Sequence, residues 1–230
     1  MVYNSPYMDK YTYKGIDIDE EKLKMIRTEF QKGIDVVNKI NPSVTFYGST
    51  RIKEGEPYYQ KVKNLTFRIA KELNYAVLSG GGPGIMEAAN RGAFEAGGKS
   101  VGLTIKLPRE QIHNPYITDE IAFNFFFTRQ SAMSYSTEVC VFCPGGFGTL
   151  SELFEILTLE QTNKIGRIPI ILYGSDFWNP IDKMIKENLL KNHHTVYESD
   201  AELYMIKDDE DEIIEIIKNS KIRNGDDSLR

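Results

Sequence analysis

The residues with the most chemical content form one run, Pro144-Gly-Gly-Phe-Gly-Thr-Leu-Ser-Glu152. The apolar segment 139–143 before this run is typical of a buried parallel strand. The residues after it predict a helix whose apolar face carries Leu150, Leu153, Phe154 and Leu157. Glycines between a strand and a helix let a ligand touch the backbone, and the N–H groups and dipole of a helix start attract an anion such as phosphate. Because Glu152 follows in the first turn, the run predicts chemistry on a phosphorylated small molecule.

Two further segments place glycines and hydroxyl residues directly after predicted strands. Gly48-Ser49 follows the strand 44–47, and the turn Ser79-Gly-Gly-Gly-Pro-Gly84 follows the strand 75–78. In an open α/β sheet, ligands bind beyond the carboxyl ends of the strands. Ser49, Gly81 and Gly82 are therefore candidate contacts for the same ligand.

Neither glycine turn carries the dinucleotide-binding fingerprint. Its third glycine would fall at positions 85 and 151, which hold Ile85 and Ser151. Gly98-Lys-Ser100 resembles the end of a phosphate loop of the NTPase type, but the leading glycine would have to stand at position 93, which is Ala93. An intact dinucleotide site is therefore not expected, and the phosphate-loop interpretation is rejected.

The elements that would position these residues alternate between helix and strand along the chain. Helices are predicted over about 20–39, 57–73, 85–96, 177–190 and after Asp208, with Asp17 or Asp19 capping the first and Asp208 the last. Strands are predicted at 44–47, 75–78, 100–105, 121–127, 139–143 and 168–173, and Thr128 is a candidate cap for a helix that carries Arg129. This alternation predicts an α/β fold, a single Rossmann-like doubly wound parallel sheet with helices on both faces. The domain would span residues 18–218, between a loose arm (1–17) and a polar tail (219–230).

Composition and charge narrow the class of partner. The chain has 230 residues, of which 41% are hydrophobic and 27% charged, and a net charge of −5. This balance gives no electrostatic reason for binding nucleic acid or a membrane surface. No apolar run approaches the roughly 18 to 20 residues that cross a bilayer, and the first 15 residues lack a signal-peptide core. A cytoplasmic protein is therefore expected.

The cysteines and histidines do not predict a metal site. Cys140 and Cys143 are spaced as C-x-x-C but lie in a predicted buried strand, whereas a redox pair would stand at a helix start and zinc would need further ligands. His113, His193 and His194 lack ligand spacing. We expect both cysteines to be buried apolar residues and the histidines to be structural or solvated.

The run from Pro144 to Glu152 resembles the PGGxGTxxE signature of the LONELY GUY (LOG) proteins. These are cytokinin riboside 5′-monophosphate phosphoribohydrolases, long labelled lysine decarboxylases. The resemblance extends from about Thr45 to Trp178. It takes in the glycine turn at 80–84, the Pro-Arg-Glu at 108–110 and the helix start at 128–133.

The resemblance implies a site and a reaction. Arg129 and Glu152 would be the catalytic residues, Glu110 and Thr158 would make further substrate contacts, and the 5′-phosphate would be bound by Gly145, Gly146, Phe147, Gly148 and Thr149. The reaction would hydrolyse the N-glycosidic bond of a nucleoside 5′-monophosphate, of the AMP or cytokinin type, to a free base and ribose 5-phosphate. No metal or organic cofactor is implied, and the assembly would be a homodimer or a higher homo-oligomer.

Some features of the chain leave the substrate and the activity open. Gln130 stands where LOG proteins usually have lysine, so a positive charge near the substrate is lost and the base preference is undetermined. A molybdenum-cofactor carrier resembles this fold and is the alternative function, with the cradle retained but no turnover. A lysine decarboxylase would need a lysine to hold pyridoxal phosphate, and no lysine of the chain has a persuasive setting for one.

Overall fold

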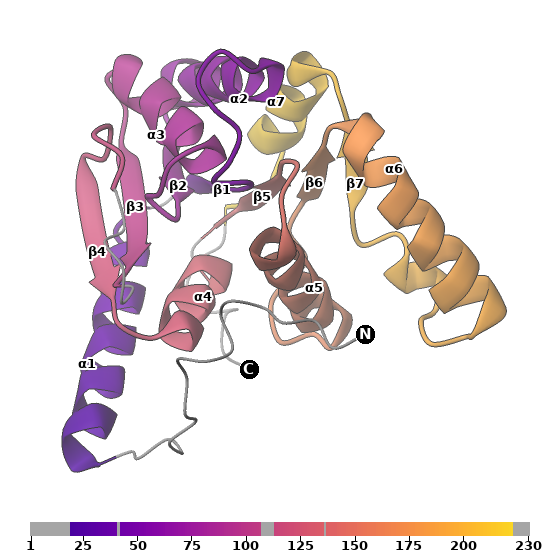
Figure 1. Ribbon diagram of the computed structural model, residues 1–230, viewed down its shortest axis with the longest axis horizontal. Helices are drawn as coiled ribbons and strands as arrows, with labels where there is room; N and C mark the ends of the chain where they lie inside the picture. The colour runs from indigo at the N-terminus through magenta and orange to yellow at the C-terminus, as the bar shows by residue number, and fades with distance from the viewer. Residues whose placement is uncertain (1–18, 41, 107–112, 136, 223–230) are drawn as a thin grey trace, which may run out of the picture.

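The computed structural model describes residues 19–40, 42–106, 113–135 and 137–222. Within them, seven strands form one parallel sheet in the order β4-β3-β2-β1-β5-β6-β7 (Figure 1). The strands are β1 (Ser43–Tyr47), β2 (Ala76–Ser79), β3 (Ser100–Ile105), β4 (Asp119–Phe123), β5 (Val139–Phe142), β6 (Ile170–Tyr173) and β7 (Met205–Lys207). This Rossmann-like doubly wound arrangement confirms the predicted fold class. The predicted arm at 1–17 and most of the predicted tail lie outside the described residues.

Helices cover both faces of the sheet. They are α1 (Glu20–Val37), α2 (Pro57–Arg68), α3 (Ile85–Glu95), α4 (Phe126–Tyr135), α5 (Phe147–Gln161), α6 (Ser175–Met184) and α7 (Glu210–Lys218). α2 continues into the π-helical turn η2 (Ile69–Leu73) and α6 into η3 (Ile185–Asn192), and a short 3-10 turn, η4 (Glu198–Asp200), precedes β7. One core layer packs α2, α3 and α7 on the sheet, and the other packs α1, α4, α5 and α6 on the opposite face (Figure 1).

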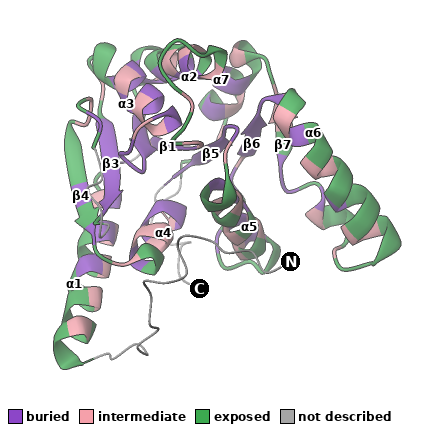
Figure 2. Cartoon of the chain, viewed as in Figure 1, coloured by how far each residue is buried: buried purple, intermediate pink, exposed green. Residues whose placement is uncertain are grey.

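The central strands are buried on both faces. Every residue of β1, β2, β3, β5 and β6 is buried, whereas the edge strand β4 exposes three of its five residues (Figure 2). Because side chains alternate along a strand, Val44 and Phe46 enter the layer under α2 and α3, and Tyr47 enters the layer with α4 and α5. Fully burying a valine or phenylalanine side chain contributes about 1.5–3 kcal/mol, so both layers hold β1 in place.

The strand order reverses between β1 and β5. These two strands pair in parallel with Val44 opposite Val139 and Tyr47 opposite Phe142. The rings of Tyr47 and Phe142 stack with centroids 4.4 Å apart and an interplanar angle of 7°. The carboxyl ends of both strands therefore lie level, and the loops after them open into the crevice where ligands bind in this class of fold.

The fourth strand and the helix after it differ from the prediction. β4 ends at Phe123 instead of reaching residue 127, and α4 already begins at Phe126, so Thr128 lies inside the first turn and is not the cap. The carboxylate of Glu29, from α1, holds the turn that leads into α4. It accepts hydrogen bonds from the N–H groups of Asn124 (2.8 Å) and Phe125 (3.1 Å) and from the hydroxyl of Thr128 (2.5 Å). Nothing in the local sequence pattern indicated this contact from another helix.

The cap of α7 and the apolar face of α5 also differ from the prediction, whereas the cap of α1 agrees with it. Asp19 caps α1, as one of the two predicted alternatives, by accepting from the N–H of Lys22. The cap of α7 is Asp209, because Asp208 accepts instead from the N–H of Ser175 at the start of α6. On α5, Phe154 is not part of the buried face and is 38% exposed, whereas Leu153 and Ile156 are buried.

In the described parts of the chain, no helix has the length and apolar character required to cross a bilayer.

Candidate active site

A cavity of about 770 Å³ lies at the carboxyl ends of β1 and β5. The loops that follow β1, β2 and β5 line it, together with the inward faces of α4 and α5. Its position is the point where the strand order reverses, and its volume is in the range of small-molecule sites. Arg129 and Glu152, far apart in sequence, both line this cavity.

The glycine run forms the start of α5 on one wall. All five residues from Gly145 to Thr149 line the cavity. Gly146 is the residue before the helix, and its space for a Cβ atom is empty, as is that of Gly148. A Cβ on Gly145 would instead overlap the side chain of Thr149. Two of the glycines therefore leave backbone N–H groups of the first turn, which have no partner within the helix, open to an anion.

Glu152 lies one turn into α5, partly buried, and accepts no hydrogen bond from the residues that the structure describes. Burial raises the pKa of its carboxyl group, the positive charge of Arg129 opposes the rise, and Glu155 adds to it, so that the pKa is about 7. A carboxyl group with this pKa exchanges protons near neutral pH, which is the property of a general acid or base.

Arg129 projects from α4 toward the same cavity. Its Nε donates a 2.7 Å hydrogen bond to the carbonyl of Leu103 in β3, which fixes the plane of the guanidinium group. Burial lowers the pKa of Arg129, and Glu152 and Tyr47 oppose that change. Because an arginine in a protein stays protonated, the group keeps its charge. A Cβ on Gly80 would overlap its Nη2 atom, so the glycine after β2 leaves the room that Arg129 occupies.

The loop after β1 is tied to both glycine turns. The N–H of Ser49 donates to the carbonyl of Pro144 (3.0 Å), and the carbonyl of Ser49 accepts from the N–H of Ile85 (3.0 Å). Gly84 has a φ of +75°, and a Cβ on it would overlap the carbonyl of Ser49, so only glycine fits comfortably there. Ser49 and Arg51 line the cavity from this loop, and Arg51 brings a second positive charge to it.

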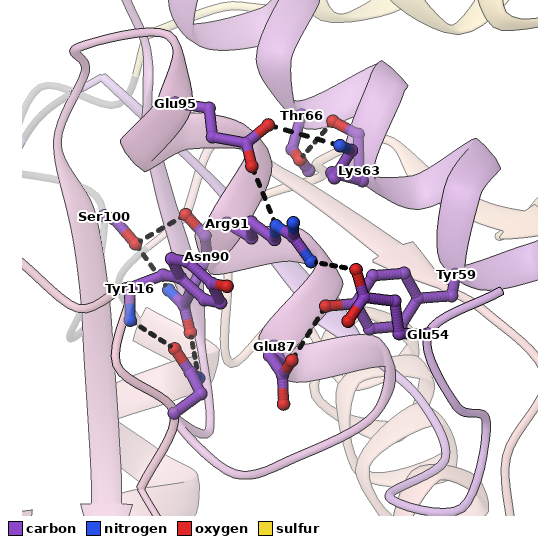
Figure 3. A network of polar contacts seen from close by, with 11 residues as sticks. Glu54, Tyr59, Lys63, Thr66, Glu87, Asn90, Arg91, Glu95, Ser100 and Tyr116 are labelled. Carbon is purple, nitrogen blue, oxygen red and sulfur yellow. Dashed lines mark hydrogen bonds and ion pairs between the residues drawn. The ribbon is translucent and has the colours of Figure 1, made fainter.

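Arg91 of α3 anchors the far side of the same loop (Figure 3). Its guanidinium group pairs with Glu54 in the loop (2.6 Å) and with Glu95 one turn further along α3 (2.7 Å). The group also lies over the ring of Tyr116, 5.1 Å from the centroid. Such partly exposed pairs stabilise weakly when single, but here they join the loop, α3 and the segment before β4 in one network.

Some of the predicted contacts lie away from the cavity. Gly81 and Gly82 do not line it, and their carbonyl groups accept hydrogen bonds from Asn114. Thr158 lies near the other end of α5, in a separate groove of about 100 Å³, and its hydroxyl donates to the carbonyl of Phe154. Glu110 lies outside the described residues. The structure thus brings together Ser49, Arg129, Glu152 and the glycine run, but not Thr158, Gly81 or Gly82.

Tyr47 and Gly80, which the sequence analysis did not select, also line the cavity. Phe126 lines it too, with 60% of its surface exposed. Tyr47 could have been found from its place as the last residue of a strand that ends at a glycine. Gly80 could not, because its partner Arg129 comes from a distant helix.

The two cysteines and His113 do not line the cavity. Cys140 and Cys143 are both buried, as predicted, and burial raises the pKa of the Cys143 thiol well above its usual range. His113 pairs with Glu120 at 2.9 Å. Across the described segments, no three His, Cys, Asp or Glu side chains cluster as ligands of a metal ion would.

Comparison with known proteins finds a matching family model and several curated relatives. A family model described as "Possible lysine decarboxylase" matches residues 86–217, more than half of the chain. The cytokinin riboside 5′-monophosphate phosphoribohydrolase LOG5 of Arabidopsis thaliana is 26% identical over 64% of this chain and 66% of its own length. A probable enzyme of the same name from Oryza sativa, LOGL2, is 29% identical over 74% and 71%. For several of these curated relatives, the match spans only about half to two thirds of their length.

Solved structures support the fold. The molybdenum cofactor carrier protein of Chlamydomonas reinhardtii superposes with a TM-score of 0.58 at 22% identity, covering 78% of this chain and 97% of the carrier. The molybdenum cofactor binding protein of Rippkaea orientalis gives a TM-score of 0.53 at 24% identity, covering 77% and 95%. At these identities the likeness is one of fold. The family model matches more than half of this chain, and the chain therefore belongs to the family described as possible lysine decarboxylases. Its resemblance to the LONELY GUY proteins is confirmed.

Proposed function

We propose that the chain hydrolyses the N-glycosidic bond of a nucleoside 5′-monophosphate, of the AMP or cytokinin riboside type, to a free base and ribose 5-phosphate. The observation that carries the proposal is the position of Glu152. A carboxyl group with a pKa raised to about 7 lies one turn from an open glycine cradle at a helix start, in a cavity that also holds Arg129. The names of the relatives from plants support the same reaction class.

The chemistry follows from the charge that develops at the sugar. As the bond between C1′ and the base nitrogen breaks, positive charge builds on the ribose ring and the bonding electrons leave with the base. The ionised carboxylate of Glu152 would stabilise this cation and accept a proton from the water whose oxygen bonds to C1′. The departing base takes up a proton from the solvent, and Glu152 returns to the solvent the proton that it accepted from water, so that the products are the neutral base and ribose 5-phosphate.

The phosphate supplies the binding energy that holds C1′ in place. The N–H groups at the start of α5 would bind it, and Arg129 would hold the phosphate or the ribose while its charge keeps part of the Glu152 population ionised. Energy gained at this remote group would position the reacting carbon and make the attack of water effectively unimolecular. The base would extend toward Phe126, whose exposed ring offers a stacking surface.

Two other activities compete with this proposal. A carrier for a nucleotide-like cofactor, such as the molybdenum cofactor, would use the same cradle without turnover, and the open cavity of about 770 Å³ is large enough to favour it as the alternative. A pyridoxal-dependent decarboxylase needs a lysine in the site. The described residues that line the cavity include no lysine, which argues against decarboxylation, the activity that the family description names.

Product analysis tests the proposal directly. The wild type is incubated with a panel of nucleoside 5′-monophosphates that includes adenylate and isopentenyl-adenylate, and free base and ribose 5-phosphate are quantified. Glu152→Gln should lose most turnover and keep phosphate binding, whereas Glu155→Gln, three residues further along the same helix and not part of the cavity lining, should keep turnover. If no substrate is cleaved but one binds tightly, the carrier function is correct. Full activity in Glu152→Gln contradicts the assigned role.

We also propose that the chain forms a homodimer or a higher homo-oligomer. Phe154 is 38% exposed on α5 and lines a groove together with Leu157 and Leu189. An apolar helix face of this kind is commonly covered by a second copy. Light scattering after size exclusion gives the mass in solution, and a monomer at micromolar concentration rules the oligomer out.

A further inference from the structure

Tyr47 has a hydroxyl group without a partner inside the site. The side chain is 2% exposed, and its hydroxyl makes no hydrogen bond with any residue that the structure describes. Leaving a buried hydroxyl unpaired costs about 1–3 kcal/mol, and such groups are rare in native proteins. The rest of Tyr47 is held in place. Its ring stacks on Phe142, and its backbone pairs with β5 in the middle of the sheet.

The position of Tyr47 places it between the two helices that carry the candidate catalytic residues. Its ring packs in the core layer that contains Met133 of α4 and Ile156 of α5. Arg129 precedes Met133 by one turn, and Glu152 precedes Ile156 by one turn, so each lies on the same helix face as its buried neighbour. Tyr47, Arg129 and Glu152 all line the same cavity.

Of the two carboxylates whose charges act on Tyr47, that of Glu152 acts more strongly and is the candidate partner. It accepts no hydrogen bond within the described residues, so its side chain is not held elsewhere. After burial, the groups that shift the pKa of Tyr47 are Cys140 of β5, Arg129 of α4, and Glu152 and Glu155 of α5. Of the two carboxylates, Glu152 has the larger effect on this pKa. The guanidinium group of Arg129 cannot accept a hydrogen bond. A tyrosine hydroxyl donates readily to a carboxylate.

We propose that Tyr47 is a positioning residue whose hydroxyl donates a hydrogen bond to the ionised carboxylate of Glu152 and holds it toward the cavity. The inference rests on the proposed function of the same site, since it concerns how Glu152 is made ready to act. A donor favours the charged form of the carboxylate over the protonated form. Tyr47 would thus extend the activity of Glu152 to lower pH.

Tyr47→Phe tests this, because it removes only the hydroxyl and keeps the stacked ring. With the substrate that the wild type cleaves fastest, we expect kcat/KM at pH 6 to fall about three- to tenfold, which corresponds to a shift of the acid limb by about half to one pH unit. At pH 8.5 the two proteins should differ by less than about twofold, because Glu152 is then ionised in both. Tyr173→Phe is the matched control: Tyr173 ends β6, is buried and bonds Glu210 outside the site. An acid limb that stays in place in Tyr47→Phe overturns the proposal.

A second measurement does not need turnover. The difference in unfolding free energy between the protein and its Glu152→Gln variant, followed from pH 4 to pH 9, reports the titration of Glu152. The midpoint should move to higher pH in the Tyr47→Phe background and stay in place in the Tyr173→Phe background. If the wild type cleaves nothing but the midpoint moves, the proposed reaction is wrong and the role of Tyr47 stands. An unchanged midpoint removes the role of Tyr47 and leaves the reaction untouched.

Discussion

Gly80 and Arg129 occupy one space: the Nη2 atom of Arg129 lies where a Cβ on residue 80 would be. Gly80 has no left-handed backbone that would require glycine. Its small size therefore serves the guanidinium group of a helix 49 positions further along the chain, and the glycine turn after β2 belongs to the site through Arg129 as much as through any contact with phosphate.

Gly80→Ala should reduce activity with little effect on stability. The added Cβ would meet the flexible ends of Arg129 and Met86, and both can move aside. We expect kcat/KM to fall about tenfold or more, in line with the loss of one well-placed charged contact, and the unfolding free energy to change by less than about 1.5 kcal/mol. Gly166→Ala, where a Cβ meets nothing within 4 Å, is the control. Normal kinetics in Gly80→Ala would show that Arg129 does not need its present position.

Gly146→Val should weaken phosphate binding selectively. Nothing lies within 4 Å of a Cβ at this position, and its φ is −95°, so the folded protein accepts a side chain there. The new methyl groups would stand in front of the N–H groups at the start of α5. We expect the inhibition constant of ribose 5-phosphate to rise about tenfold or more, as for lost hydrogen bonds to a charged group. Circular dichroism and calorimetry should match the wild type, and unchanged inhibition would place the phosphate elsewhere.

The pH profile of kcat/KM should rise through about pH 7 and then level off. Glu152 must be ionised to stabilise the ribosyl cation or accept a proton, and its pKa is raised to about 7 in the free protein. kcat/KM reports the groups of the free enzyme. A profile that is highest below pH 6 would mean that the protonated form of Glu152 is the active one.

Glu152→Gln should stabilise the protein at alkaline pH. Because the folded state holds the Glu152 proton more tightly than the unfolded state, stability falls as the pH rises from about 4.5 to about 7. The variant lacks this titration, so it should match the wild type near pH 4.5 and exceed it above pH 7. The gain, reduced by partial exposure of the group, is about 1–2 kcal/mol. Urea unfolding at pH 5 and pH 8 measures it, with Glu21→Gln on the exposed face of α1 as control.

Glu29→Gln should lower both stability and activity. Burial raises the pKa of Glu29, but its hydrogen bonds with Thr128, Asn124 and Phe125 more than offset this, and the net shift is downward. Their stabilising contribution is therefore present at neutral pH and lost as the pH falls below the usual range of a glutamate. Losing the charge at the start of α4 should cost about 1–3 kcal/mol and displace Arg129. If activity falls while the unfolding free energy is unchanged, the loss of activity does not follow from the loss of the Glu29 contacts.

The sequence predicted the layers and the cradle because these depend on local patterns. Apolar runs predicted the strands β1, β2, β5 and β6, and the glycines after strands predicted which loops line the cavity. The features that the sequence did not predict depend on contacts between distant segments. Glu29 on α1 holds the turn before α4, and Asn114, from the segment before β4, bonds the carbonyl groups of Gly81 and Gly82, which do not line the cavity. The raised pKa of Glu152 likewise follows from burial that no spacing rule encodes.

The pairing of β1 with β5 also sets when the site can form during folding. Ser43 and Glu138, which join the two strands at their start, are 95 residues apart in sequence. Contacts of this separation are expected to close late, because closing so long a loop costs entropy before the contacts can offset it. Tyr47, the loop at Ser49 and the glycine run meet only after that step. Recovery of ligand binding in a refolding experiment should therefore lag behind the helical signal and report the docking of the two halves of the sheet.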